Sequence, residues 1–281
     1  MSASMPIARR EGRTPGTGTA RRFPASTGRF DRAADRMVFD TLVQWIEDNY
    51  REDLRQRPSK HVYVSKLPTA VVVQIDLLRD SSVIRDVILQ HVPAGSVVHP
   101  MKHTDELYLS HYNKDFGGDQ GLYSKHYDGN LRFLPWCPVV RALIYLQSDA
   151  TYTVVFGDSG VRKAFTTYEF GLLDFHRELH WVEGRYNPDD RQRILLKCNY
   201  LIMPARGGAL ARTMLGANTA VFYVVKAAME YSKSPRTPPQ FVVGLLCNLF
   251  RLLNNVHPVV PLALIAVVFA ASGWGIARLL G

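Results

Sequence analysis

Two histidines and one aspartate in the middle of the chain have the types and spacing of metal ligands. His126 and Asp128 stand two residues apart in the segment Tyr-Ser-Lys-His-Tyr-Asp-Gly, and His180 follows further along the chain. Residues i and i+2 of a strand project from the same face, so the first two can turn toward one ion. Two imidazoles and one carboxylate leave three positions of an octahedral ion open. The pattern predicts a metal centre with room for further ligands.

Other residues downstream could complete such a centre, and several compete for each place. His176 and His180 are alternatives for the third ligand. Arg191, Arg193 and Lys197 are alternatives for a cation that holds a bound carboxylate. We prefer Arg193 because it stands immediately before the apolar run Ile-Leu-Leu, at the start of a predicted strand, where a guanidinium can clamp a carboxylate through two hydrogen bonds.

The elements that must position these residues are short strands preceded by helices. Apolar residues recur at helical intervals over 37–54 and 76–92, which predicts two helices. From about residue 96, short β-favouring runs are separated by turn residues. The predicted strands are 106–112, 122–127, 139–146, 151–156, 164–168, 171–175 and 194–202. This order predicts a mainly β fold with flanking α-helices, either a sandwich, a barrel or a jelly roll.

Four motifs, in order along the chain, carry a resemblance to a known family. They are Tyr123-x-x-His126-x-Asp128-Gly129, the strand Val140–Leu146, the segment Gly171–Phe175 that leads to His180, and Arg193. This arrangement resembles the 2-oxoglutarate/Fe(II)-dependent dioxygenase superfamily, and within it the prolyl-4-hydroxylase-like branch. The resemblance covers about residues 105–203 and implies a double-stranded β-helix, which is a jelly roll.

The resemblance also implies a role for individual residues. His126, Asp128 and His180 would be the ligands of Fe(II), and Arg193 would bind the far carboxylate of 2-oxoglutarate. Tyr145, which ends the Ile-Tyr-Leu strand, matches a family position whose hydroxyl helps to hold that carboxylate. Ascorbate is the reductant that such a centre implies.

Two details bear on how closely the chain follows the family. The family's distal histidine comes about nine residues after a glycine, which favours His180, after Gly171, over His176. A Gly-Gly-x-Thr-x-Phe segment is common in the family after the Tyr-Leu strand, whereas this chain has Tyr152–Asp158 with a different sequence there. The substrate side of the predicted pocket therefore departs from the family pattern.

The start of the chain differs in composition from the part that carries the motifs. The formal net charge is +9, and much of the positive charge belongs to arginines before Met37. Residues 1–36 are rich in Arg, Gly, Pro, Ser and Thr, so we expect a disordered tail. Residues 37–232 are expected to form the catalytic domain, with a helical front at 37–95, a jelly-roll core at about 96–205 and a trailing helix to 232.

The end of the chain predicts attachment to a membrane. Residues 233–239 form a Pro-rich linker, and 240–256 predict an amphipathic interfacial helix. Residues 257–281 include an uncharged run of the length that a transmembrane helix needs, with Trp274 near one end. Lys233, Arg236 and Arg251 precede this run, whereas only Arg278 follows it. The charge bias predicts a single-pass, tail-anchored protein whose catalytic domain faces the cytosol.

Taken together, the motifs and the resemblance imply hydroxylation of a C–H bond. A prolyl or lysyl side chain of a protein is the first expectation for the substrate, and a lipid or another small molecule is the second. Nucleic acid is disfavoured because the folded region has no stripe of basic residues interleaved with aromatic ones. The alternatives are a catalytically silent, membrane-anchored jelly roll that binds a partner, and a cupin-like enzyme that uses another metal.

Overall fold

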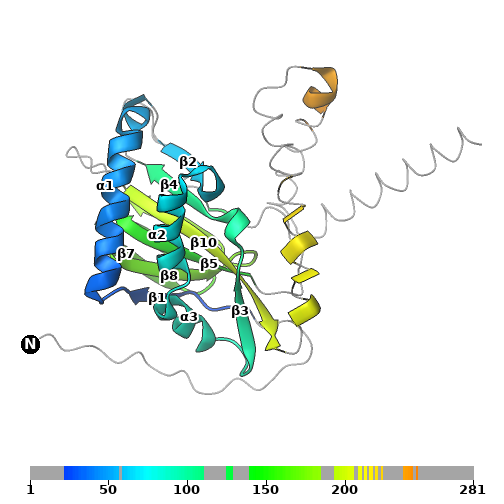
Figure 1. Ribbon diagram of the computed structural model, residues 1–281. Coiled ribbons are helices and arrows are strands. Elements are labelled where there is room, and N and C mark those ends of the chain that lie inside the picture. Colours follow the sequence, from blue (N-terminus) through cyan, green and yellow to red (C-terminus); the bar gives the residue numbers. More distant parts are fainter. Residues whose placement is uncertain are drawn as a thin grey trace, which may run out of the picture.

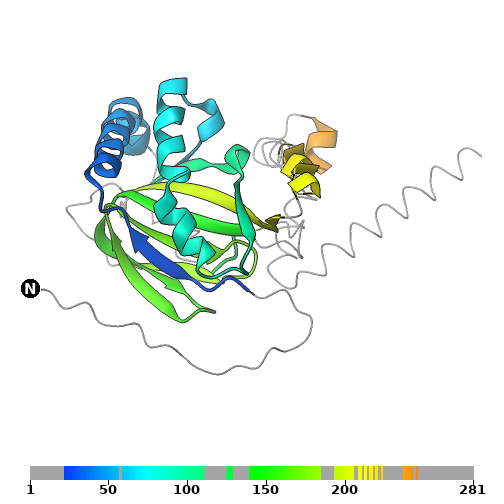
Figure 2. The same ribbon diagram turned by 60° about the horizontal axis from the view of Figure 1, so that its bottom comes forward.

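Two antiparallel sheets and three helices make up the described part of the chain up to residue 205. The computed structural model describes residues 22–56, 59–110, 125–128, 139–184 and 193–205, together with parts of 208–245. The two sheets lie against each other, and the helices cover the outer face of the larger sheet (Figure 1, Figure 2). The fold is mixed α/β with antiparallel sheets, so the prediction of a mainly β fold with flanking helices is confirmed in part.

The larger sheet has seven strands, and its longest strand is its centre. In spatial order the strands are β1 (Ser26–Arg29), β8 (Glu169–Asp174), β5 (Val139–Gln147), β10 (Arg193–Pro204), β4 (Glu106–Ser110) and β2 (Ser59–Tyr63), and β3 (Ser96–Pro100) also pairs with β10. The smaller sheet has the order β7 (Val161–Thr166), β6 (Asp149–Phe156) and β9 (His180–Gly184). Every strand pair is antiparallel.

Three helices close one face of the larger sheet. They are α1 (Ala33–Gln56), α2 (Thr69–Arg79) and α3 (Ser82–Leu89), and two short 3-10 turns, η1 (Val64–Lys66) and η2 (Lys102–Thr104), stand before α2 and β4. Ser81 separates α2 from α3, because its hydroxyl accepts a hydrogen bond from the Val83 amide at the start of α3. The single helix predicted over 76–92 is therefore two helices.

Strand β5 shows why the core residues form an almost continuous apolar run in the sequence. Val140, Ala142, Ile144 and Leu146 pack against the helices, whereas alternate residues such as Tyr145 face the smaller sheet. A strand that is buried on both faces has no polar side to reveal its two-residue period. The space between the two sheets forms a second core. We call the face of the larger sheet that is turned toward the smaller sheet the inner face.

The first residues of the fold correct one prediction. Residues 22–36 belong to the folded domain rather than to a disordered tail, since β1 pairs with β8 and α1 begins at Ala33. Phe23 and Phe30 are buried. Gly28 lies against the ring of Phe170 so closely that a side chain would not fit between them. The polar sequence of β1 gives no alternation of apolar residues, but these contacts hold the segment on the sheet.

Several predictions fall wholly or partly outside the described residues. These are the tail before residue 22, the first half of the strand predicted over 122–127, the residue Arg191, most of the linker at 233–239, and the anchor at 257–281. Within the described residues, no helix is both long and apolar enough to cross a bilayer.

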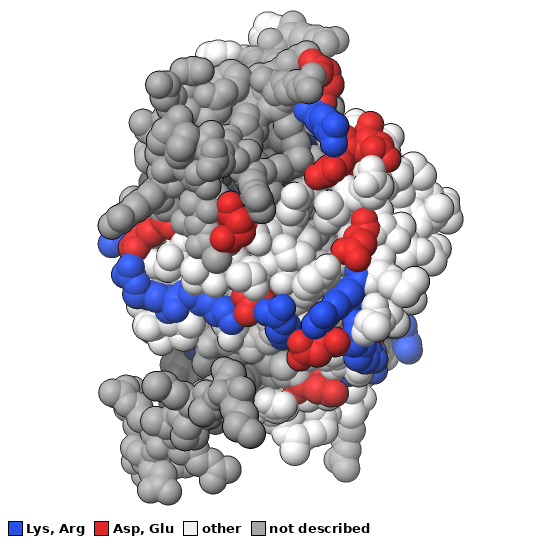
Figure 3. All heavy atoms as spheres, turned by 90° about the vertical axis from the view of Figure 1, so that its left-hand side faces the viewer, with Lys and Arg blue, Asp and Glu red and all other residues white. Residues whose placement is uncertain are grey.

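Charged residues on the α1 side of the molecule are largely paired with opposite charges. Figure 3 shows this side, where Lys and Arg side chains form a band with Asp and Glu side chains beside it. The ion pairs of β1, α1 and β7 include Arg32 with Asp35, Arg29 with Asp31, Lys163 with Glu169 and Arg162 with Glu183. Exposed pairs of this kind contribute little to stability, about 0–1 kcal/mol each.

Candidate metal centre

A short backbone ladder brings the two predicted histidine ligands side by side. The His126 amide donates to the His180 carbonyl and the His180 amide donates to the His126 carbonyl, each over 3.0 Å. Residues that exchange both hydrogen bonds in an antiparallel pair point to the same face. The two imidazole centroids are accordingly 4.4 Å apart. This pairing joins the start of β9 to a segment that stands far away in the sequence.

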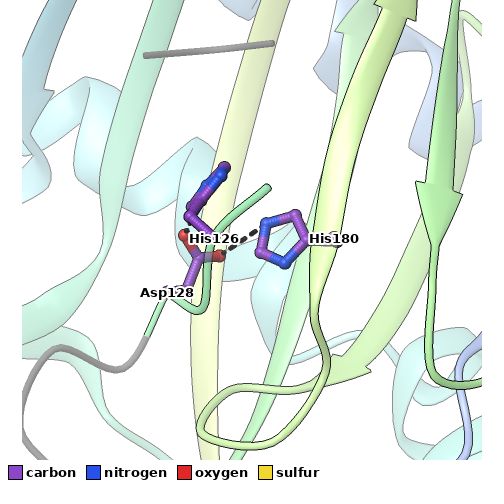
Figure 4. Close-up of side chains that lie close together, drawn as sticks. All are labelled: His126, Asp128 and His180. Atoms are coloured by element: carbon purple, nitrogen blue, oxygen red, sulfur yellow. Dashed lines mark ion pairs between the residues drawn. The ribbon is translucent and has the colours of Figure 1, made fainter. Parts of the chain in front are cut away.

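Asp128 completes the cluster from the same segment as His126. Its Oδ1 lies 3.6 Å from His126 Nε2, and its Oδ2 lies 3.5 Å from His180 Nε2 (Figure 4). One potential ligand atom from each residue lies within 4.8 Å of the other two. The three side chains that the sequence singles out therefore point toward a common space, and this arrangement is what a facial site of two histidines and one carboxylate requires.

The protonation states of Asp128 and His180 suit metal binding. Burial alone would raise the pKa of Asp128, but the Arg141 guanidinium and the His180 ring hold the pKa of this carboxyl well below its ordinary value. Burial lowers the pKa of His180, so its ring is neutral near pH 7. His180 Nδ1 lies 3.1 Å from the Glu178 carbonyl oxygen. If that nitrogen carries the proton, the lone pair of Nε2 faces the cluster.

Arg141 is a site residue to which the sequence reasoning gave no role. Its Nη1 lies 2.8 Å from Asp128 Oδ2, and its Nε donates to Asn199 Oδ1 over 3.0 Å. Its guanidinium also lies 4.4 Å from the centroid of the Phe175 ring. The signal for this role was a single arginine in the apolar run Val139–Leu146, because a charge inside a buried strand needs a partner.

Arg193 and Lys197 lie on the same face of β10 but have different surroundings. Lys197 Nζ is paired with Glu106 Oε1 at 3.3 Å. Arg193 is only 3% exposed, and its Nε donates to Ser110 Oγ over 3.3 Å. The buried Nη1 of Arg193 has no hydrogen-bond partner among the described residues. Lys197 is therefore already paired with a carboxylate, whereas Arg193 retains a donor for a bound carboxylate.

Tyr145 lies in the core between the sheets, and His176 lies outside the metal cluster. Tyr145 stands opposite Leu195 in the sheet and stacks on Phe165, with the two ring centroids 4.4 Å apart. Burial raises the pKa of Tyr145 far above its ordinary value, so its hydroxyl remains protonated as a donor. His176 is buried beside Phe175 and does not belong to the metal cluster.

Comparisons with known proteins return solved structures only. No protein-family model and no curated protein sequence matches the chain. A prolyl 4-hydroxylase from Phytophthora capsici is 14% identical with a TM-score of 0.42, over 84% of this chain and 82% of that one. A prolyl-4-hydroxylase from Pseudomonas putida is 16% identical with a TM-score of 0.38, over 64% and 92%.

A third match is the non-haem alpha-ketoglutarate-dependent epimerase SnoN from nogalamycin biosynthesis. It is 12% identical with a TM-score of 0.45, over 64% of this chain and 78% of that one. The chain is thus similar in structure to 2-oxoglutarate/Fe(II) dioxygenases, prolyl 4-hydroxylases among them.

Proposed function

We propose that this protein is an Fe(II)- and 2-oxoglutarate-dependent dioxygenase that hydroxylates a C–H bond. The observation that carries the proposal is the convergence of His126, Asp128 and His180 on one space between the sheets. Arg193 supports it, because this buried cation on the inner face retains an unused donor. A buried, unsatisfied charge is costly, so its presence favours a ligand that neutralises it.

The donor atoms of the cluster fit Fe(II). Two neutral imidazole nitrogens and one ionised carboxylate oxygen are the donor set of non-haem iron sites with open positions. Asp128 is ionised at neutral pH, and His180 is neutral. The cluster therefore needs no proton release from these two residues before it binds a divalent ion.

The inner face also fits a dicarboxylate such as 2-oxoglutarate. Arg193 would bind the carboxylate remote from the metal, and the protonated Tyr145 hydroxyl is a second donor in the same core. Apolar neighbours, including Val154, Phe165 and Leu195, line this core. A guanidinium in such surroundings forms a stronger ion pair with a carboxylate than it would in water.

When bound, Fe(II), 2-oxoglutarate and dioxygen would supply chemistry that replaces a substrate hydrogen by hydroxyl and yields succinate and carbon dioxide. The protein's own part is orientation. Arg193 fixes one end of the co-substrate, and Arg141 holds the Asp128 carboxylate by an ion pair. The apolar core limits the access of water to the space beside the cluster.

A prolyl or lysyl side chain of a protein is the substrate that we propose first. The support is the prolyl-4-hydroxylase-like order of the motifs that contain His126, Tyr145, His180 and Arg193. A lipid-like or other small molecule comes second, because it would suit an enzyme attached to a membrane.

The test uses the full-length protein with Fe(II), 2-oxoglutarate and ascorbate. Succinate is measured with and without proline- and lysine-containing peptides, and hydroxylated products are identified by mass spectrometry. We expect succinate formation that depends on Fe(II) and is lost in the variants His126→Ala and Asp128→Ala.

Two outcomes would contradict the proposal in different ways. A wild-type protein that binds no divalent metal would favour the silent jelly roll that binds a partner. Metal binding with an activity that ignores 2-oxoglutarate and survives Arg193→Met would favour a cupin-like enzyme on another metal.

We also propose that residues 257–281 anchor the protein to a membrane with the catalytic domain in the cytosol. The support is the uncharged run before Arg278 and the bias of positive charge toward its N-terminal side. Full-length protein should remain with the membrane fraction after a carbonate wash, whereas protein that ends at residue 239 should be released. Retention of the shortened protein would contradict the proposal.

A further inference from the structure

The loop that carries His180 into the site is held by a carboxylate that has no contact with the metal cluster. The Glu178 side chain is fully buried. Its carboxylate accepts hydrogen bonds from Ser159 Oγ over 2.6 Å, from the Asp158 amide over 3.0 Å and from the Ser159 amide over 3.1 Å. Glu178 thus ties the segment before β9 to the turn between β6 and β7.

Arg22 supplies the charge that balances this buried carboxylate. Its Nη2 lies 2.5 Å from Glu178 Oε2 and 2.9 Å from Asp158 Oδ2, so one guanidinium bridges both acidic groups. Asp158 Oδ2 in turn accepts from the Leu179 amide over 2.7 Å. The Gly157 amide donates to the Leu179 carbonyl over the same distance. The two residues directly before His180 are therefore fixed through contacts with Arg22 or its partners.

The residues next to Arg22 hold it in place. Phe23 is buried, and its amide donates to Asp174 Oδ2 over 3.3 Å. The Ala25 amide donates to Ser159 Oγ over 3.0 Å. Beyond these contacts, β1 continues along the edge of the larger sheet beside β8 (Figure 2). The segment from Arg22 to Ala25, here called the N-terminal strap, joins both loops that meet at Glu178.

The connection to the metal centre runs through the backbone of Glu178. The Glu178 carbonyl oxygen is the group that lies 3.1 Å from His180 Nδ1. Its position decides which ring nitrogen faces Asp128 and at what angle. A shift of Glu178 would therefore turn the His180 ring, although neither the Glu178 side chain nor Arg22 contacts the cluster.

We infer that the N-terminal strap is part of the metal site, with Arg22 and Glu178 acting as positioning residues for His180. The inference deepens the proposed function and rests on it. It assigns a role to a residue at the start of the folded domain that lies far from every motif of the sequence. Partners that orient a metal-binding histidine typically change metal affinity by about 10- to 100-fold when they are removed.

The test is metal affinity, measured without turnover. Full-length protein is titrated with Co(II) in the absence of 2-oxoglutarate, and the visible absorption of the bound ion reports both affinity and ligand geometry. We expect Arg22→Ala and Glu178→Gln to weaken Co(II) binding about tenfold or more and to alter the spectrum. Arg22→Lys should recover part of the affinity, because it restores the charge.

Arg29→Ala is the matched control, since it removes an arginine from β1, the strand that directly follows the strap. Arg29 pairs with Asp31 and Glu169, which lie outside the network of Glu178. This control should bind Co(II) like the wild type. Urea unfolding of the metal-free proteins shows whether each variant still folds. An Arg22→Ala protein that is folded but binds Co(II) weakly supports a positioning role.

Each outcome bears on a different claim. If wild-type protein fails to bind Co(II), the proposed function fails. If the wild type binds, and Arg22→Ala and Glu178→Gln bind with the same affinity and spectrum, only the role of the strap is overturned. Equal weakening in Arg22→Ala and Arg29→Ala would also overturn it, since the effect would then come from charge alone.

Discussion

Replacing Arg193 by methionine should weaken 2-oxoglutarate binding without destabilising the metal-free protein. Arg193 is 3% exposed, and its guanidinium Nη1 has no hydrogen-bond partner among the described residues. An unsatisfied buried donor costs about 1–3 kcal/mol. The substitution removes this cost. It also removes the hydrogen bond to Ser110 Oγ, which contributes about 0.5–1.5 kcal/mol, and the contact of the guanidinium with the Tyr152 ring at 4.9 Å, which is worth about 0.5–2 kcal/mol. These effects nearly cancel, so the free energy of unfolding should stay within about 1 kcal/mol of wild type.

The loss of co-substrate binding should be much larger. Truncating one partner of a buried, hydrogen-bonded charge pair costs about 2–5 kcal/mol. Since about 1.4 kcal/mol corresponds to tenfold, the KM for 2-oxoglutarate in Arg193→Met should rise by about 30-fold or more. The assay is succinate formation as a function of 2-oxoglutarate concentration, combined with urea unfolding of the metal-free protein followed by tryptophan fluorescence.

Lys197→Met is the control for the stability measurement. Lys197 pairs with Glu106, and both side chains are largely buried. Removing the lysine leaves that carboxylate without its cation, which should cost about 3 kcal/mol of unfolding free energy. If Arg193→Met were destabilised as strongly as Lys197→Met, or if its KM for 2-oxoglutarate were unchanged, Arg193 would have another partner and could not be the clamp.

Three further substitutions test the charged groups around the core. Arg141→Met should lower Co(II) affinity by about tenfold or more, because Asp128 loses the cation at 2.8 Å; unchanged affinity in the Co(II) titration would contradict this. Glu106 has a pKa of about 2, since Lys197 and His61 outweigh the effect of burial. Its ionised form stabilises the fold above about pH 4.5, and this stability is lost as pH falls toward 2. Glu106→Gln should therefore flatten the pH dependence of urea unfolding over that range, and an unaltered profile would argue against this origin. Arg79→Met should lose about 3–5 kcal/mol of unfolding free energy, because Asp105, 2.9 Å from the guanidinium, would stay buried without a partner; a chemical melt close to wild type would contradict it.

The parts of the fold that the sequence predicts well are those whose pattern is local. Strands β5, β6, β8 and β10 lie within a few residues of the predicted runs, because apolar and β-branched residues mark them. Strands β1, β2, β3 and β9 were missed. The sequence of β1 is Ser-Thr-Gly-Arg, which has no apolar period, and it is a strand only because its neighbour β8 offers a free edge.

The three proposed ligands could be found from the sequence, but the residues that support them could not. His126 and Asp128 can be recognised because they stand two residues apart, which is a local sequence pattern. Glu178 looks like an ordinary charged loop residue until its carboxylate is seen to be buried with Arg22 beside it. Such pairs join residues that are distant in the sequence, and neither member has a neighbour that reveals the other.

The choice between Arg193 and Lys197 depends on the register between strands, which the sequence pattern of one strand does not give. Both residues stand on the same face of β10, and both are cations that could bind a carboxylate. What separates them is the residue opposite each on β4, which is Ser110 for Arg193 and Glu106 for Lys197. Register between strands depends on the packing of whole faces, and one step along β4 would turn its side chains to the other face. Arg193 keeps an unpaired donor because of the residue that lies opposite it in the folded sheet, and the spacing of residues within β10 cannot predict this.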